Sequence, residues 1–167
     1  PKALAEEIIE SYDNLSLDPE VAKNTAAEVL NIIKRSREPP FVAVRSSATT
    51  EDLEGASFAG QQETFLNMKG NNQLIDAVKR CWASLFTARA IYYRAKNGFS
   101  YDQSLIAVVV QKMVESEKSG VTFSINPSTN NQNEIVIEAV FGLGEGIVSG
   151  SIAPDRYILN KTTMEIK

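Results

Sequence analysis

A hydroxyl-rich segment after a short apolar run carries the most distinctive chemistry of this sequence. Arg45 leads into four hydroxyl side chains and then a loop of small residues: Ser46, Ser47, Thr49, Thr50, and the loop Ser57-Phe58-Ala59-Gly60-Gln61. A guanidinium offers a planar set of donors that matches phosphate oxygens, and glycine lets the backbone approach an anion closely. The segment therefore predicts a phosphate-binding loop or, with equal weight, a polar hairpin loop at the end of a strand.

The second candidate is a strand end, Gln111-Lys112-Met113-Val114, which closes the apolar run from Leu105 to Val110. Backbone N–H and C=O groups exposed there could read the edge of an adenine ring, while Met113 and Val114 cover its faces. On the residues alone, the favoured interpretation is an ordinary strand end that runs into a loop.

Two acidic positions complete the candidates. Glu145 lies in Gly142-Leu143-Gly144-Glu145-Gly146, which is not a dinucleotide fingerprint because Ile occupies position 147. A turn into a short helix is favoured, although such a helix start could attract a phosphate, or Mg²⁺ through Glu145. Glu138 lies inside an apolar strand. We expect it on the solvent face rather than in a cleft, because burying an unpaired carboxylate is costly.

The elements that position these residues follow from periodicity and turn signals. Helices are expected at 3–12, 19–36 and 73–96, with Cys81 and Trp82 in the core; strands are expected at 41–44, 63–68, 105–110 continuing to 114, 120–125, 134–140, and a closing hairpin of 156–159 with 163–166. The run 105–110 should be covered on both faces. The fold class is therefore α+β, a mostly antiparallel sheet with helices packed to one side.

Composition excludes several functions. The 167 residues carry a net charge of −4, which argues against a nucleic-acid surface, and no apolar run is long enough for a membrane span. The absence of histidine excludes imidazole-based catalysis, an imidazole metal site and a phosphohistidine within these residues. The single cysteine excludes an internal disulfide and fits a reducing, cytoplasmic setting. Because the chain starts without Met and ends in a strand-like run, we expect a piece of a longer polypeptide.

Four stretches resemble a known family: VRSSATTEDLEGASFAGQQETFLN, KRCWASLFTARAIYYR, VVVQKMVESEKSGVTFSINP and EAVFGLGEGIVSGSIAPDRY. In this order they are similar to the ATP-binding domains of phosphoenolpyruvate synthases, whose wider family includes pyruvate phosphate dikinases and rifampin phosphotransferases. The resemblance covers about residues 41–167 and implies an ATP-grasp fold that holds ATP between two subdomains. It divides this partial domain into a helical lead-in (1–40), a phosphate-loop subdomain (41–103) and an adenine-hinge sheet (104–167).

The resemblance also implies roles for residues. Arg45 would be the catalytic residue, contacting the ATP phosphates and stabilising charge during phosphoryl transfer. The remaining ATP-binding residues would be Ser57, Ala59, Gly60 and Gln61 over the phosphates, Gln111, Lys112, Met113 and Val114 as the adenine hinge, and Thr122, Glu138 and Glu145 along the cleft.

The implied reaction converts ATP, pyruvate and water to phosphoenolpyruvate, AMP and phosphate through a phosphohistidine on a separate domain. Its partners would be ATP, the phosphohistidine domain and the pyruvate-binding domain, with no nucleic acid and no membrane. The chain lacks the family's upstream glycine-lysine segment and the downstream block with magnesium-binding residues, so Mg²⁺ ligands are expected mainly elsewhere and this part alone should be inactive. Uncovered apolar surface could lead to a homo-oligomer. The alternatives are a related phosphotransferase with another acceptor, or a non-catalytic nucleotide-binding module.

Overall fold

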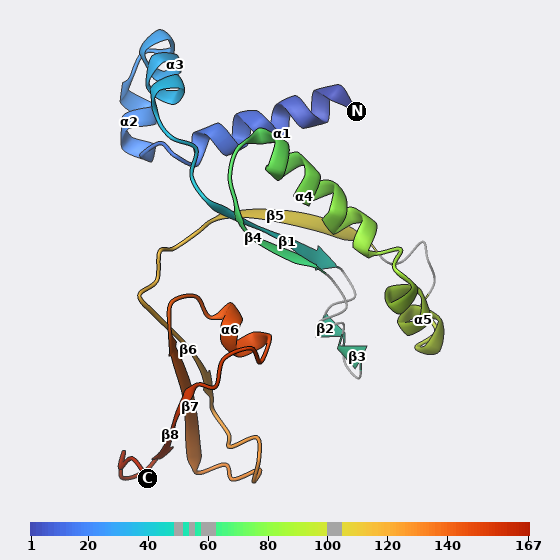
Figure 1. The fold of residues 1–167 in the computed structure, drawn as a ribbon, viewed down its shortest axis with the longest axis vertical. Helices are drawn as coiled ribbons and strands as arrows, with labels where there is room; N and C mark the ends of the chain where they lie inside the picture. Colours follow the sequence, from blue (N-terminus) through green and yellow to red (C-terminus); the bar gives the residue numbers. More distant parts are fainter. Residues whose placement is uncertain (49–51, 54–55, 58–62, 100–104) are drawn as a thin grey trace. The chain divides into compact units, whose positions relative to one another are not determined.

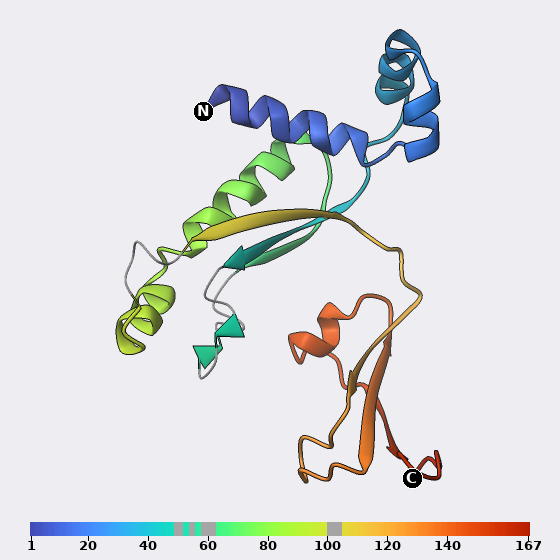
Figure 2. The ribbon, with the colours of Figure 1, turned by 180° about the vertical axis from the view of Figure 1, so that it is seen from behind.

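The computed structural model describes residues 1–48, 52–53, 56–57, 63–99 and 105–167, which form two units, Pro1–Met113 and Val114–Lys167 (Figures 1 and 2). The elements in chain order are α1 (Lys2–Asn14), α2 (Pro19–Asn24), α3 (Ala27–Ser36), β1 (Val42–Ala48), β2 (Asp52–Leu53), β3 (Ala56–Ser57), β4 (Thr64–Met68), α4 (Asn71–Ser84), α5 (Ala88–Lys96), β5 (Ile106–Lys112), β6 (Lys118–Phe123), β7 (Glu134–Phe141), α6 (Glu145–Val148) and β8 (Asp155–Asn160). The α+β class expected from the sequence is confirmed.

The first unit is built on an antiparallel sheet with the strand order β4-β1-β5. Helices α1 and α4 lie on the same side of this sheet in both views (Figures 1 and 2). Successive strand residues point to opposite faces, so Val42 and Val44 pack beneath the helices at 0% exposure while Arg45 and Ser47 are exposed. One face of the sheet is therefore covered by helices, and the other carries both polar side chains, such as Arg45, and apolar ones, such as Val109.

The core of this unit joins the two helices to β1. Its buried members are Tyr12, Val42, Val44, Leu74, Ala77, Val78 and Cys81. The Tyr12 hydroxyl donates to the Pro40 carbonyl (2.7 Å) and accepts from the Gly70 N–H (2.9 Å), so it ties α1 to the segments that precede β1 and α4. Burial raises the pKa of the Cys81 thiol to about 11, which is consistent with the predicted core role of this residue.

Two helices expected to be continuous are each divided in two. The predicted helix 19–36 breaks at Thr25 and Ala26, which are extended, and forms α2 and α3. The predicted helix 73–96 breaks before Thr87, whose hydroxyl accepts from the Ala90 N–H (3.3 Å) and caps α5. In both cases apolar periodicity continues through the break, so the pattern alone concealed it.

Three further expectations for the first unit are wrong. Trp82 is 36% exposed rather than part of the core. Strand β5 is not covered on both faces, since Val109 is 47% exposed. Strand β1 continues to Ala48, so Ser46 and Ser47 belong to the strand and not to the polar loop that was expected after Val44.

The second unit is an antiparallel sheet with the order β6-β7-β8, against which the short helix α6 packs. Central β7 buries Val136 (0% exposed) and Val140 (8% exposed). The closing hairpin is confirmed only in part: β8 pairs along β7, whereas the predicted strand 163–166 makes a single bridge between Leu159 and Ile166.

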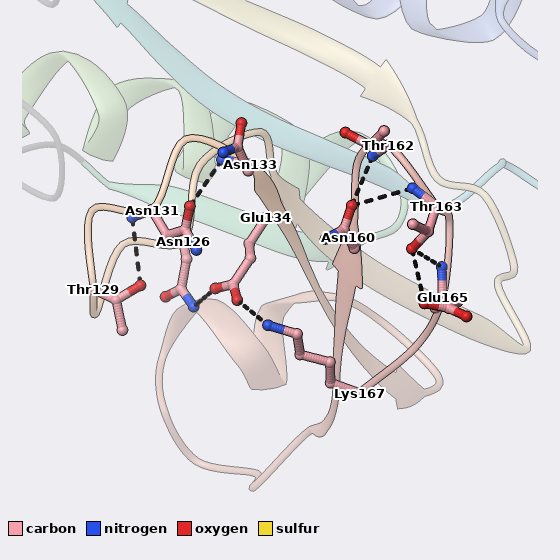
Figure 3. A network of polar contacts seen from close by, with 10 residues as sticks. All are labelled: Asn126, Thr129, Asn131, Asn133, Glu134, Asn160, Thr162, Thr163, Glu165 and Lys167. Carbon is pink, nitrogen blue, oxygen red and sulfur yellow. Dashed lines mark hydrogen bonds and ion pairs between the residues drawn. The ribbon is translucent and has the colours of Figure 1, made fainter.

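A polar network closes one end of this sheet (Figure 3). The Glu134 carboxylate, in a residue that is 8% exposed, accepts from Lys167 Nζ (2.7 Å) and Asn126 Nδ2 (2.8 Å). These two hydrogen bonds, the one from Lys167 first, lower the pKa of Glu134. The side chain of Asn160 accepts from the backbone N–H groups of the following turn. The network holds turns together and contains none of the candidate site residues.

Candidate functional site

Arg45 lies in β1 on the face of the sheet that α1 and α4 leave open. Its register partners are Thr64 on β4 and Val109 on β5. Strand alternation explains the placement, because Val44 points into the core and the next residue must point to the opposite face. The result is an exposed guanidinium on an open sheet surface, flanked by a hydroxyl on one side and an apolar side chain on the other.

Gln111 lies on the same open face as Arg45. It is opposite Ala43 on β1, and Arg45 is opposite Val109, so the two candidate residues lie on neighbouring strands two register positions apart. Such diagonal neighbours stand about 7–8 Å apart, within reach of long side chains. The structure thus brings one candidate phosphate residue and one candidate adenine-hinge residue to a single surface.

The other candidates of the phosphate loop are described only in part. Strands β2 and β3 form a short antiparallel pair in which Ser57 is opposite Asp52. Ala59, Gly60 and Gln61 lie outside the described residues, and their proposed place over the phosphates stays a prediction.

The rest of the predicted hinge alternates along the strand end. Lys112 is opposite Val42, so it lies on the face opposite to Gln111, and the Met113 N–H donates to the Phe41 carbonyl (2.8 Å). Val114, which is 74% exposed, begins the second unit. Among the described residues β5 is one of the two edge strands of its sheet, so every second N–H and C=O group points away from β1. These are the backbone groups that could read a ring edge.

Thr122 and Glu138 are not brought together. In the register of β6 and β7, Thr122 is opposite Ile137, whereas Glu138 is opposite Val121. Directly opposed residues share a face and successive residues alternate, so Thr122 and Glu138 point to opposite faces of the sheet. A ligand on one face therefore contacts one of these two side chains and not the other.

Glu138 has a cationic neighbour on its own face. Arg156 of β8 is its register partner, and the Arg156 Nε lies 3.8 Å from the Glu138 carboxylate. Arg156 also donates from Nη2 to the Ser128 hydroxyl (3.1 Å). The Glu138 side chain is 25% exposed, so the sequence-based expectation of a solvent-facing carboxylate is only partly met. The half-buried carboxylate is instead stabilised by the neighbouring guanidinium.

Glu145 is the first residue of α6 and is exposed. It follows a glycine-rich turn, in which a Cβ on Gly144 would lie 3.4 Å from the Cβ of Ser119. Ser119 and Val121 share a face of β6, and Glu138 is opposite Val121. The turn that carries Glu145 therefore lies on the same side of the sheet as Glu138, and on the side away from Thr122.

The described residues provide few ligands for a magnesium ion. Within the described ranges no three or more Asp, Glu, Cys or His side chains gather in a way that could hold a metal ion. Glu138 is engaged by Arg156, and Glu145 does not belong to a carboxylate group. These residues do not fit a magnesium site of their own.

Sequence reasoning did not single out three neighbours of the candidates. Thr64 is the partner of Arg45, Arg156 is the partner of Glu138, and Ser119 contacts the glycine-rich turn. Each is defined by strand register, which depends on where bulges and turns fall along the chain. The one sequence signal that could have helped to find Ser119 is the side-chain alternation of residues 118–123, which places Ser119 and Val121 on one face.

An antiparallel sheet with an exposed arginine on its open face, ending in an unpaired strand edge, is a surface suited to nucleotide phosphates and bases. Residues 2–167 match the family of the pyruvate phosphate dikinase AMP/ATP-binding domain, and the chain belongs to this family. The resemblance inferred from the motifs is thereby confirmed. Within the described residues, no helix has the length and apolarity needed to cross a membrane.

Similar curated proteins include phosphoenolpyruvate synthases and probable phosphoenolpyruvate synthases of archaea. The chain is 53% identical over its whole length to the phosphoenolpyruvate synthase of Pyrococcus furiosus, of which it covers 18%. It is 53% identical over 99% of its length to a probable phosphoenolpyruvate synthase of Pyrococcus abyssi, covering 20% of that protein. It is 58% identical over 75% of its length to a probable phosphoenolpyruvate synthase of Methanocaldococcus jannaschii, covering 10%. The chain thus spans at most about a fifth of these three relatives.

Proposed function

We propose that this chain is the ATP-binding part of a phosphoenolpyruvate synthase. The full-length protein would convert ATP, pyruvate and water to phosphoenolpyruvate, AMP and phosphate, with a phosphohistidine on another domain carrying the phosphoryl group. The observation that carries the proposal is the membership of residues 2–167 in an AMP/ATP-binding family, together with Arg45 on an open sheet face. The names of the archaeal relatives, phosphoenolpyruvate synthase and probable phosphoenolpyruvate synthase, support the choice of pyruvate as the acceptor.

In this account Arg45 binds the phosphates. Its planar guanidinium can hold phosphate oxygens in two parallel hydrogen bonds. As charge develops on the transferred phosphoryl group, a fixed cation stabilises the transition state more than the ground state. The loop that contains Ser57, Ala59, Gly60 and Gln61 would cover the phosphates from the neighbouring segment.

Gln111, Lys112, Met113 and Val114 would bind the adenine. Support comes from the edge position of β5, whose outward backbone groups can donate to and accept from the ring edge. Gln111 shares the open face with Arg45, so the base and the phosphates of one nucleotide could be held along a single surface. This arrangement is the ATP-grasp site that we infer for the full-length protein.

The second unit would supply Glu138 and Glu145. Both belong to one side of its sheet, so a nucleotide that meets one of them has the other nearby. Thr122 points to the opposite face and would not contact the same ligand atoms. Magnesium, when bound, would neutralise phosphate charge, and most of its ligands would come from residues beyond this chain.

The proposal is tested with the full-length protein by following AMP, phosphate and phosphoenolpyruvate together. We expect the three products in equal amounts, formed only when both ATP and pyruvate are present. ATP binding without any pyruvate-dependent AMP would point to another acceptor or to a non-catalytic module. A folded protein that neither binds ATP nor forms AMP would contradict the proposal altogether.

A further inference from the structure

Two serine hydroxyls converge on one backbone carbonyl beside the glycine-rich turn. Ser119 Oγ donates to the Gly142 carbonyl over 2.6 Å, and Ser116 Oγ lies 3.1 Å from the same oxygen. The two hydroxyl oxygens are 3.0 Å apart. Both serines are half-buried. We call Ser116, Ser119 and Gly142 the serine clasp; all three belong to the second unit.

The two serines contribute unequally to holding the Gly142 carbonyl, because each hydroxyl has only one proton to donate. The shorter contact indicates that the Ser119 proton goes to the Gly142 carbonyl, and the Ser116 proton then goes either to that carbonyl or to the Ser119 oxygen. In both arrangements Ser119 holds the carbonyl directly. Ser116 adds a second hydrogen bond whose loss the clasp can survive.

The backbone N–H of Gly142 is held as well as its carbonyl. The Gly142 N–H donates to the Glu117 carbonyl over 2.8 Å, so both polar groups of this residue face the segment 116–119. Gly142 has φ of +80°, a conformation that other residues adopt only with strain. A Cβ built on the next glycine of the turn, Gly144, would lie 3.4 Å from the Ser119 Cβ, so this part of the turn also runs past Ser119. The path of the chain out of β7 is therefore held at the Gly142 carbonyl by Ser119 and at the Gly142 N–H by the Glu117 carbonyl.

The residue delivered by this path is Glu145, three positions after Gly142. A turn with two glycines has many accessible conformations, so an external tether is needed to hold it in one of them. We propose that Ser119 is a positioning residue, which with Ser116 fixes the Gly142–Glu145 turn and so places the Glu145 carboxylate at the nucleotide site. This inference rests on the proposed function, because it assigns Ser119 a role in ATP binding that acts through Glu145.

The test is a double-mutant cycle in the full-length protein, with the KM for ATP as readout. Removing one hydrogen bond to a backbone group should raise this KM about five-fold in Ser119→Ala, with a smaller effect in Ser116→Ala and kcat nearly unchanged. Ser119→Thr keeps a hydroxyl and should restore most of the loss. Ser124→Ala is the matched control, because Ser124 is an exposed serine just after β6.

The cycle pairs Ser119→Ala with Glu145→Gln. If Ser119 acts through Glu145, the double variant should have the KM of Glu145→Gln alone. The inference would be overturned if the increases in KM of the two single variants multiplied in the double variant. It would also be overturned if Ser119→Ala had the same KM for ATP as Ser124→Ala. Glu145→Gln with an unchanged KM would overturn it too, a result that leaves ATP binding by the domain intact. A wild-type protein that binds no ATP would instead contradict the proposed function. Circular dichroism checks that each variant is folded, and if Ser119→Ala is not, the same cycle is read with Ser116→Ala.

Discussion

Arg45 and Gln111 lie on the same face of one antiparallel sheet, two register positions apart on the neighbouring strands β1 and β5. The helices α1 and α4 lie on the other side of this sheet (Figure 1), and among the described residues of the first unit Arg45 and Gln111 are exposed. The sequence suggested these residues for different ends of a nucleotide, the phosphates and the base. Because both residues lie on one face, the strand pair β1 and β5 can present the phosphate-binding and the base-binding group to the same nucleotide.

The opposite orientations of Thr122 and Glu138 predict unequal effects on ATP binding. Glu138→Gln should raise the KM for ATP, because Glu138 shares its side of the sheet with the turn that carries Glu145. Thr122→Val, which keeps the shape and removes the hydroxyl, should change this KM less than about two-fold, since no hydrogen bond to the ligand is lost. Steady-state kinetics of the full-length variants would measure both. A large effect of Thr122→Val with none for Glu138→Gln would place the nucleotide on the other face.

Gly120 is required by a close backbone approach between β6 and β7. A Cβ at this position would lie 2.8 Å from the Glu138 carbonyl oxygen, which is part of a strand and cannot move away cheaply. Gly120→Ala should therefore destabilise the second unit by about 1–3 kcal/mol. Hydrogen exchange of the β6 and β7 amides would report the loss as faster exchange.

Gly146→Ala is the control for this prediction. A Cβ on Gly146 would meet the Ile152 Cδ1 at 2.6 Å, which is closer, but Ile152 is a 49% exposed side chain that can change rotamer. We expect a smaller loss of stability than in Gly120→Ala. Equal losses would show that the strand register at Gly120 is not the limiting constraint.

The Tyr12 hydroxyl predicts a local stability effect in the first unit. Tyr12→Phe removes the donor to the Pro40 carbonyl and the acceptor for the Gly70 N–H, both in a part-buried setting. The cost should be about 1–3 kcal/mol. Hydrogen exchange should show faster exchange of the Gly70 amide itself. Tyr92→Phe, at a residue that is 68% exposed, should leave that amide protected, and equal exchange in the two variants would argue against the bridging role.

Glu134 predicts a pH dependence of stability in the second unit. Its folded-state pKa is lowered, first by the hydrogen bond from Lys167 and then by that from Asn126 (Figure 3). The carboxylate therefore stabilises the fold above its ordinary pKa of about 4.3, and this contribution is lost as the pH falls through the lower folded-state pKa. The advantage of the wild type over Glu134→Gln in urea unfolding should be largest near pH 7 and vanish in acid.

Glu115→Gln, at an exposed position, is the matched variant for this measurement. It should not alter the slope of stability against pH. An advantage of the wild type over Glu134→Gln that is the same at pH 3 and pH 7 would show that the stabilisation by Glu134 does not come from its ionised carboxylate.

Local sequence signals were sufficient to predict which segments are helices and which are strands, but not where a helix is interrupted. The apolar stripe through Leu74, Val78 and Cys81 correctly predicted α4. The same stripe continued through Leu85 into α5, so it hid the break at Thr87, although Thr87 carries the hydroxyl that caps the second helix. A threonine inside a periodic apolar run can be recognised as an N-cap only in the structure, where the turn before it is no longer helical.

The site could be predicted as a set of residues but not as an arrangement. Arg45 was suggested by local chemistry and Gln111 by the family resemblance, yet their common face depends on the register between β1 and β5, which are separated by more than fifty residues of chain. The same applies to Glu138, because its partner Arg156 is set by the pairing of β7 with β8. Non-local pairing is decided by tertiary packing, which periodicity does not encode.

The central claim is that this domain binds ATP through Arg45, and isothermal titration of the full-length protein with ATP tests it most directly. Losing a charge-assisted hydrogen-bonding group should cost about 1.5–3 kcal/mol, which raises the Kd about 10- to 100-fold in Arg45→Ala. Arg45→Lys should be intermediate, since lysine keeps the charge without the planar fork. Arg35→Ala, an exposed arginine on α3, should retain the wild-type Kd. A folded Arg45→Ala protein with the wild-type Kd for ATP would contradict the account.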